Sequence, residues 1–483
     1  MVSNDLRRGS NWTDVDDISR RTFLKYSAGT LGALGLSSLL FGCGGGGRSP
    51  TAPLLVFTDV HFNPFYDPLI VPALMSSDAS QWEGIFNSSL VLTPSTYGAD
   101  TNYPLLELAL ASIRQNKGSS PVVIYTGDIL SHGFPQSFYT YRNGTQSSAN
   151  DADTAAMIAF ADTALLFFMR QVRTAVGDTP IMFALGNADS YTGYGPDSAF
   201  LANTAELYFK QFLNGTTDHE QFLSSFRAGG YYSAQPIGTD LVVIGLNTSI
   251  FSPLVPGDND LAVNTQLAWF DSQLAQAEMA GRKAWLLMHI PPGADIGTTA
   301  RKADSNGHID AASATMMWKP AYQALFLQTL GKYHDTVKMT FAGHTHMDEF
   351  RICSPGNVLS IAPGISPVFN NNSAYKVVTF SRNTFEPTDY AIVNCDVSKM
   401  TPGQFNSEYR FSTAYGATGL LNRSLEQLFP ALATDSSKQT RYRTYYYADN
   451  NSLNPITNTT WPIYWLGIDK MTQQDLIDSV NAL

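Results

Sequence analysis

The chain has 483 residues, 44% of them hydrophobic and 15% charged, and its formal net charge is −11 at pH 7. This composition is typical of a globular protein with a large core and excludes extended disorder. The negative charge argues against a nucleic acid polymer or an anionic membrane surface as the main partner. The length allows a large catalytic domain and a smaller second domain.

The first 43 residues predict an export signal. Residues 19–25 (SRRTFLK) resemble the twin-arginine export motif, and the apolar residues 31–41 are too few to span a bilayer comfortably. The sequence LFGC that ends in Cys43 resembles a bacterial lipobox, which predicts a lipid on this cysteine; the alternative is signal cleavage near an incidental cysteine. The glycine-rich residues 44–52 would then be a flexible tether. We expect a protein exported by the twin-arginine route to the periplasmic side or cell surface, with membrane contact only through Cys43.

Five short apolar segments are each followed by residues that commonly bind metals. Each segment is rich in aliphatic or β-branched residues and ends in Gly, Asp, Asn or Pro, which is typical of a buried strand that runs into a loop. In chain order, residues 54–58 precede Asp59 and His61, residues 122–126 precede Asp128, residues 181–185 precede Asn187, residues 285–288 precede His289, and residues 337–342 precede His344 and His346. Strand carboxyl ends border the ligand-binding crevice of open α/β sheets, so we expect these side chains to converge.

The seven polar side chains could hold two metal ions if one carboxylate bridges them. Imidazole, carboxylate and amide groups suit zinc, with iron and manganese as alternatives. A helix is expected between the first two of these segments, because Pro104 precedes a helical apolar pattern that runs from Leu105 to Ile113.

The order of the motifs, Asp-x-His, Gly-Asp, Gly-Asn, His and Gly-His-x-His, resembles the calcineurin-like metallophosphoesterases over most of the chain. The resemblance implies an α/β fold, a four-layer β-sandwich flanked by helices. It also implies two metal sites that share Asp128. One site would consist of Asp59, His61, Asp128 and His346, and the other of Asp128, Asn187, His289 and His344.

Further motifs resemble the acid sphingomyelinase-like branch of this family. They are Tyr97-Gly-Ala-Asp100 before Pro104, the sequence HIPPG from His289, and the sequence GHTHMDEF from Gly343. The C-terminal region, including Glu408-Tyr-Arg-Phe and Ala414-Tyr-Gly, also resembles this branch. The resemblance implies a catalytic domain over residues 53–365 and a small, mainly helical subdomain over residues 366–483.

The C-terminal region contains short strand patterns at residues 375–380 and 390–393 and helical patterns at residues 424–432 and 472–482. Cys353 and Cys395 flank part of this region. An exported protein can form disulfides, so these cysteines predict either one bridge or two unrelated buried thiols.

Two metal ions could hold a bridging hydroxide as the nucleophile and stabilise an in-line displacement at phosphorus. The family motif places a proton-donating histidine after the metal-binding asparagine, but this chain has Ala188 there. The branch also has a histidine four residues after the bridging aspartate, and His132 keeps that position. We therefore predict that Asp128 and His132 are catalytic; the alternative is that His132 is an ordinary loop histidine.

The sequence thus predicts a metal-dependent phosphoesterase, and more specifically a monomeric phosphodiesterase. Soluble, nucleotide-like substrates are favoured, because no cysteine-rich lipid-handling module separates the signal from residue 54. One alternative is a sphingomyelinase or phospholipase C-type hydrolase that acts on lipid phosphoesters. The other is a metal-containing binding lipoprotein with weak catalysis, because Ala188 replaces the usual histidine.

Overall fold

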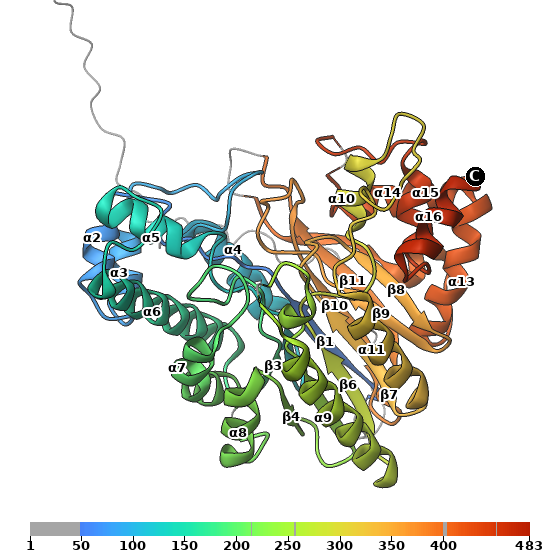
Figure 1. Cartoon of the computed structure of the whole chain (residues 1–483), viewed down its shortest axis with the longest axis horizontal. Helices are drawn as coiled ribbons and strands as arrows, with labels where there is room; N and C mark the ends of the chain where they lie inside the picture. The colour runs from blue at the N-terminus through green and yellow to red at the C-terminus, as the bar shows by residue number, and fades with distance from the viewer. Residues whose placement is uncertain (1–48, 214, 256, 399–402, 451) are drawn as a thin grey trace, which may run out of the picture. The chain divides into compact units, whose positions relative to one another are not determined.

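The computed structural model of the chain describes residues 49–213, 215–255, 257–398, 403–450 and 452–483. The predicted export motif, the lipobox with Cys43 and residues 44–48 of the predicted tether lie outside this part. Residues Ser49–Leu483 belong to one compact unit built around two mixed β-sheets (Figure 1).

The first sheet has the strand order β12-β11-β10-β1-β2-β3. Strand β1 is parallel to β2, and β2 is parallel to β3, whereas β10, β11 and β12 continue the sheet in antiparallel fashion. The strands are β1 (Thr51–Phe57), β2 (Val123–Tyr125), β3 (Ile181–Phe183), β10 (Ser373–Ser381), β11 (Pro387–Cys395) and β12 (Asn406–Arg410).

The second sheet has the order β4-β5-β6-β7-β9-β8. Its central strands β5, β6, β7 and β9 are parallel, and β4 and β8 are antiparallel edge strands. The strands are β4 (Tyr232–Ala234), β5 (Leu241–Gly245), β6 (Lys283–Leu287), β7 (Val337–Ala342), β8 (Glu349–Ser354) and β9 (Asn357–Ile361).

Helices connect and cover the strands. The helices before β10 are α2 (Val71–Met75), α3 (Trp82–Asn87), α4 (Tyr103–Asn116), α5 (Phe134–Asn143), α6 (Asp151–Val176), α7 (Ser198–Tyr208), the π-helix η1 (Phe209–Leu213), α8 (His219–Gly229), the 3₁₀ helix η2 (Ser249–Phe251), α9 (Asp260–Met279), α10 (Ile296–Lys302) and α11 (Pro320–Lys332). The helices after β12 are α12 (Phe411–Tyr415), α13 (Leu421–Thr434), α14 (Ser436–Tyr446), α15 (Trp461–Leu466) and α16 (Gln473–Asn481).

Both faces of the second sheet are buried, so its strands are apolar on both sides. In β5, Leu241 and Val243 join the large core cluster that includes the β1 side chains, whereas Val242 and Ile244 pack in another cluster with residues of α9 and α11. Helices α4 and α6 lie against the first sheet (Figure 1); the ring of Phe168 in α6, for example, packs against a tyrosine of β2. The layers are therefore helix, sheet, sheet and helix, which confirms the predicted four-layer α/β class.

Helix α4 shows how the local sequence sets an element. The Asn102 side chain accepts a hydrogen bond from the Leu105 N–H, and Pro104 occupies the first turn, where its missing N–H has no cost. Leu105, Ala109 and Ile113 form the buried stripe that the sequence predicted.

The predicted ligand-bearing segments are strands, but they do not share one sheet. Strands β1, β2 and β3 belong to the first sheet, and β6 and β7 belong to the second. This partition between two sheets agrees with the predicted β-sandwich. A run of buried apolar residues predicts a strand without specifying its neighbours. The tether prediction is also too long, because Thr51 and Ala52 already belong to β1.

The region after residue 366 contributes β10, β11 and β12 to the first sheet and then forms α12 to α16. The predicted subdomain boundary at residue 365 stays a prediction. Cys353 lies in β8 of the second sheet and Cys395 in β11 of the first, and they form no disulfide. The second of the two alternatives considered from the sequence, two separate thiols, is therefore found: Cys353 packs against one core cluster and Cys395 belongs to another.

Candidate metal centre

The loops after the strands hold the predicted ligands in an unusual backbone conformation. Five of the seven have a positive φ, in the left-handed region that non-glycine residues adopt infrequently and that Asp and His tolerate better than most. They are Asp59 (49°), His61 (45°), Asp128 (64°), His344 (73°) and His346 (64°). The chain therefore turns sharply after β1, β2 and β7, and the side chains of both sheets meet.

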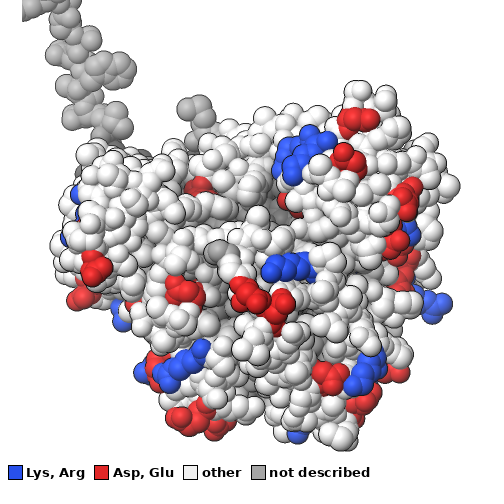
Figure 2. All heavy atoms as spheres, in the orientation of Figure 1, with Lys and Arg blue, Asp and Glu red and all other residues white. Residues whose placement is uncertain are grey.

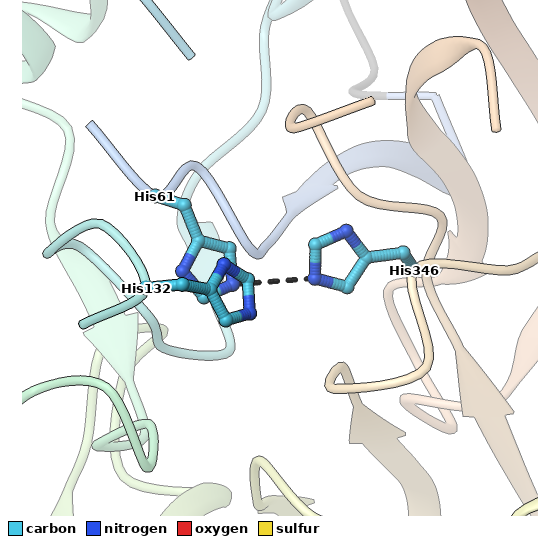
Figure 3. Close-up of side chains that lie close together, drawn as sticks. All are labelled: His61, His132 and His346. Atoms are coloured by element: carbon cyan, nitrogen blue, oxygen red, sulfur yellow. Dashed lines mark hydrogen bonds between the residues drawn. The ribbon is translucent and has the colours of Figure 1, made fainter. Parts of the chain in front are cut away.

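The first group of side chains surrounds Asp59. The His346 Nε2 atom lies 3.4 Å from Asp59 Oδ1 and 3.2 Å from His61 Nε2, so these imidazoles face each other (Figure 3). His61 Nε2 also lies 3.3 Å from Asp128 Oδ2. Asp59 is held by the backbone N–H of His344, which donates to both carboxylate oxygens.

The second group surrounds His289. Its Nε2 atom lies 3.1 Å from Asn187 Oδ1 and 3.1 Å from Asp128 Oδ2. The ligand atoms of Asp128, His289 and His344 all lie within 4.8 Å of one another. Because the same oxygen of Asp128 faces His61 in the first group and His289 in the second, this carboxylate lies between the two groups.

Backbone carbonyls fix the orientation of three of the imidazoles. The Nδ1 atom of His61 lies 3.0 Å from the Leu130 carbonyl oxygen, that of His289 lies 2.7 Å from Thr126 O, and that of His346 lies 3.1 Å from Ser366 O. A carbonyl only accepts hydrogen bonds, so each Nδ1 is the protonated nitrogen. The Nε2 atoms are left to bind a cation, as is usual for metal-ligating histidines.

Burial and the neighbouring carboxylates set the charges in this centre. Burial by itself would lower the pKa values of His61 and His289, but the neighbouring carboxylates, Asp128 foremost and Asp59 with it, together outweigh burial and raise both pKa values to about 9. Burial lowers the pKa of His344 to about 4 and that of His346 to about 3. Without metal, protons on His61 and His289 therefore balance the buried carboxylates. Metal ions that bind here would displace these protons.

The donor atoms fit a pair of divalent transition metals. The four imidazoles, two carboxylates and one amide are mixed nitrogen and oxygen ligands, which suit zinc, iron and manganese. All seven predicted ligands, Asp59, His61, Asp128, Asn187, His289, His344 and His346, are brought to one place where the two sheets meet.

The two residues that follow Asn187, Ala188 and Asp189, hold Asp128 in place. The Ala188 N–H donates to Asp128 Oδ1 at 2.7 Å, so this alanine contributes through its backbone and carries no proton-donating side chain. The buried Asp189 carboxylate accepts hydrogen bonds from the backbone N–H groups of Asp128, Ile129 and Gly186. Burial and the Asp128 charge raise the pKa of Asp189 to about 6. Asp189 thus ties the loops after β2 and β3 together.

His132 lies beside the centre and is 40% exposed. Its ring stacks on that of His61, with centroids 3.8 Å apart (Figure 3). Asp100 holds it twice: Oδ1 lies 2.9 Å from Nδ1, and Oδ2 accepts the His132 backbone N–H at 2.8 Å. This role of Asp100 was not predicted. Asp100 does belong to the motif Tyr97-Gly-Ala-Asp100 before α4, and this motif was the signal in the sequence that could have identified it.

Glycines allow the close approach of these loops, which gives a testable prediction. A Cβ atom on Gly186 would lie 1.9 Å from Asp128 Oδ1 and 2.2 Å from the Asp128 nitrogen. Such overpacking typically costs about 1 to 3 kcal/mol. We expect Gly186→Ala to lower the unfolding temperature and the bound metal measured by mass spectrometry.

The matched control is Gly331→Ala. This glycine lies in α11 with no atom within 4 Å of the added Cβ, so alanine should stabilise the helix by roughly 0.5 to 1 kcal/mol. If Gly186→Ala retained the wild-type metal content, the close packing around Asp128 would not matter for the centre.

Comparison with known proteins identifies the family. Residues 52–348 match the family model described as calcineurin-like phosphoesterase. Sphingomyelinase phosphodiesterase D of Dictyostelium discoideum is 25% identical over 75% of this chain and 78% of its own length. Acid sphingomyelinase-like phosphodiesterase 3b of Homo sapiens is 23% identical over 83% and 84%, and cyclic GMP-AMP phosphodiesterase SMPDL3A of Rattus norvegicus is 23% identical over 82% and 84%. These relatives agree with the predicted branch. The chain belongs to the calcineurin-like phosphoesterase family and is a metal-dependent phosphoric ester hydrolase.

Proposed function

We propose that the protein is a phosphodiesterase that holds two divalent metal ions and hydrolyses soluble phosphodiesters of the nucleotide type. The observation that carries this proposal is the position of Asp128 Oδ2, which lies 3.3 Å from His61 Nε2 and 3.1 Å from His289 Nε2. One carboxylate oxygen can thus serve both ligand groups. Zinc is the expected metal, and iron and manganese fit the same donors.

Bound metal ions would neutralise phosphoryl oxygens and make a water molecule nucleophilic at neutral pH. The chain's own contribution is to hold these ligands rigidly. Asp189 joins the loops after β2 and β3, and the Ala188 N–H fixes the second oxygen of Asp128. Such outer partners typically change metal affinity or activity by about 10- to 100-fold when they are removed.

We assign the proton transfer to the leaving group to His132. Its Nδ1–H donates to Asp100, so Nε2 is the nitrogen that can give a proton to a departing alkoxide. The Asp100 carboxylate would stabilise the charged imidazole and fix its orientation. Stacking on His61 places the ring next to the metal ligands, where a leaving group would depart. Asp100 is thus a positioning residue for His132.

The names of the relatives mention two kinds of phosphodiester. Sphingomyelin is a lipid phosphodiester and cyclic GMP-AMP is a soluble one. On the face drawn in Figure 2, lysine and arginine side chains are scattered and form no continuous basic surface. This distribution and the net charge of −11 argue for a small substrate and against a nucleic acid polymer.

The substrate class can be tested by direct competition. We expect faster hydrolysis of soluble nucleotide diesters than of sphingomyelin in vesicles at equal phosphate concentration. Released phosphomonoester would be measured by chromatography, with Asp128→Ala as the inactive control. Faster turnover of sphingomyelin than of every nucleotide tested would favour the sphingomyelinase-type alternative. Metal binding without turnover of either class would favour a binding lipoprotein.

We also propose that the protein is exported as a monomer and anchored by a lipid on Cys43. This proposal rests on the sequence before residue 44, which lies outside the described residues. Cys43→Ser is expected to release the protein from the membrane fraction and leave phosphodiesterase activity intact, as measured by fractionation and assay. Membrane association of the variant would show that the lipobox is accidental.

A further inference from the structure

A cavity outside the metal centre is lined by residues at or near the ends of β10, β11 and β12. Its volume is about 500 Å³, and its lining is mostly amides and hydroxyls. The lining side chains include the Tyr97 hydroxyl, two carboxylates and five amides: Asp396, Asp449, Asn372, Asn394, Gln404, Asn406 and Asn450. None of the phosphodiesterase chemistry described above uses these residues.

The strand pairing places this cavity at the same edge of the first sheet as the metal centre. Strand β10 is antiparallel to β1, so its first residues lie beside the carboxyl end of β1, which leads into Asp59. Asn372 immediately precedes β10, and Asn394 near the end of β11 pairs with Asn406 at the start of β12. Strand β11 is two strands away from β1, so the cavity lies on the order of 10 Å from the metal ligands along this edge.

Two chain segments connect the cavity with the metal centre. In one, Tyr97 lines the cavity and Asp100 binds His132. In the other, the Ser366 carbonyl accepts the His346 Nδ1–H and Asn372 lines the cavity. The Tyr97 hydroxyl donates to Asn372 Oδ1 at 2.5 Å and joins the two segments.

Phe369 lies in the second of these segments and borders the metal centre. It is 44% exposed, and its ring centroid lies 4.7 Å from that of His346 and 5.6 Å from that of His132. A substrate whose phosphate lies at the metal centre can therefore extend past an aromatic surface towards the cavity.

The lining chemistry favours a hydroxyl-rich group without negative charge, because its amide and carboxylate oxygens accept hydrogen bonds from hydroxyls. An asparagine amide offers two donors and an acceptor oxygen, and the backbone occupies only part of this capacity. The Nδ2 atoms of Asn372 and Asn394 donate to the Ala448 carbonyl at 2.8 and 2.9 Å, which fixes both amides in place. The described lining residues include no lysine or arginine, which argues against a second phosphate.

A buried carboxyl group lies two residues along β12 from the lining residue Asn406 and is not itself in the lining. Glu408 is two residues beyond Asn406 in β12, and both of its carboxyl oxygens are buried and lack a hydrogen-bond partner among the described residues. Burial, with help from Asp348 and Asp449, raises the pKa of Glu408 well above its usual range.

We propose that this cavity is a subsite for a sugar or similar polyhydroxylated group of the phosphodiester substrate. The proposal rests on the proposed function and adds to it the chemical class of one substituent on the phosphate. Amides that donate and accept would bind hydroxyl groups, and the exposed ring of Phe369 would contact the part of the substrate between phosphate and cavity.

The test compares two substrates that release the same leaving group. They are bis(4-nitrophenyl) phosphate, which has no sugar, and thymidine 5′-(4-nitrophenyl phosphate), which has one. We expect Gln404→Ala and Asn406→Ala each to lower the ratio of kcat/KM for the thymidine ester to that for the aryl ester by about five- to tenfold, mainly through KM. Asn406→Trp, which fills the cavity, should lower the ratio further.

The matched control is Gln276→Ala, which removes an exposed amide on α9 and should leave the ratio unchanged. An unchanged ratio in all three cavity variants would overturn the subsite proposal. Failure of the wild-type protein to hydrolyse bis(4-nitrophenyl) phosphate would instead overturn the proposed function, so the two failures are distinguishable.

Discussion

Replacing Asp128 by alanine is expected to abolish hydrolysis of bis(4-nitrophenyl) phosphate and to remove metal from the protein. The Asp128 Oδ2 atom lies within 3.3 Å of His61 Nε2 and 3.1 Å of His289 Nε2, so its loss would weaken both ligand groups at once. Loss of an outer partner of a metal ligand costs about 10- to 100-fold in affinity or activity. Loss of a ligand that both groups share should lower the metal affinity and the activity by more than about 100-fold. Metal content by mass spectrometry and initial rates would measure both effects.

The control for this variant is Asp271→Ala, which removes an exposed carboxylate of α9 that pairs with Lys332. It should keep the wild-type metal content and rate. Circular dichroism would establish that the Asp128→Ala protein is folded. A folded Asp128→Ala protein with two bound ions and more than a tenth of the wild-type rate would contradict the bridging role.

The second large effect is expected at His132. A positioned general acid contributes about 10² to 10⁴ in rate, and it matters most for leaving groups that depart badly as anions. His132→Ala should therefore slow alkyl phosphodiesters by about 100-fold or more and 4-nitrophenyl esters only slightly. Rates across a series of leaving groups would be plotted against leaving-group pKa, and the slope should steepen.

Two further variants separate a general acid from a residue with a merely structural role. Ala188→His restores the histidine of the family motif and should flatten the slope by accelerating the poorest leaving groups. Asp100→Asn should steepen the slope less than His132→Ala does, and it should add nothing to the His132→Ala variant. If neither His132→Ala nor Ala188→His changes the slope, another group supplies the proton and our assignment fails.

The residues that converge at the candidate metal centre could be predicted from the sequence because each follows a short, apolar strand. Such strands are buried on both faces, and the polar residues at their ends stand out against them. In β7, the predicted limits of residues 337–342 coincide with the strand Val337–Ala342. Helix α4 could be predicted equally well, because Pro104 and the apolar spacing after it both indicate a helix. Local patterns of this kind depend on a few neighbouring residues.

Contacts between distant residues could not be predicted in the same way. Asp100 and His132 are 32 residues apart, and only the fold brings them to 2.9 Å. The partition of the strands between two sheets likewise depends on pairing partners that an apolar run does not specify. For the same reason the sequence left open whether Cys353 and Cys395 form a disulfide; in the fold they pack in different core clusters and form none.

The left-handed backbone conformations in the loops could also not be predicted from the sequence. Asp59, His61 and Asp128 adopt positive φ angles although only Gly127 among the adjacent residues suggests a left-handed turn. Glycines elsewhere make room for them, as Gly343 does beside Thr58 and Asp59. These positions follow from tertiary packing and not from local preference.

The most direct test of the binuclear phosphodiesterase is a metal titration of the apo protein without its first 43 residues. Zinc would be added in steps, and hydrolysis of bis(4-nitrophenyl) phosphate would be measured at each step. We predict that activity rises until two equivalents are bound per chain and then stays constant. A plateau at one equivalent, or two bound equivalents of zinc, iron or manganese without any hydrolysis, would contradict this account.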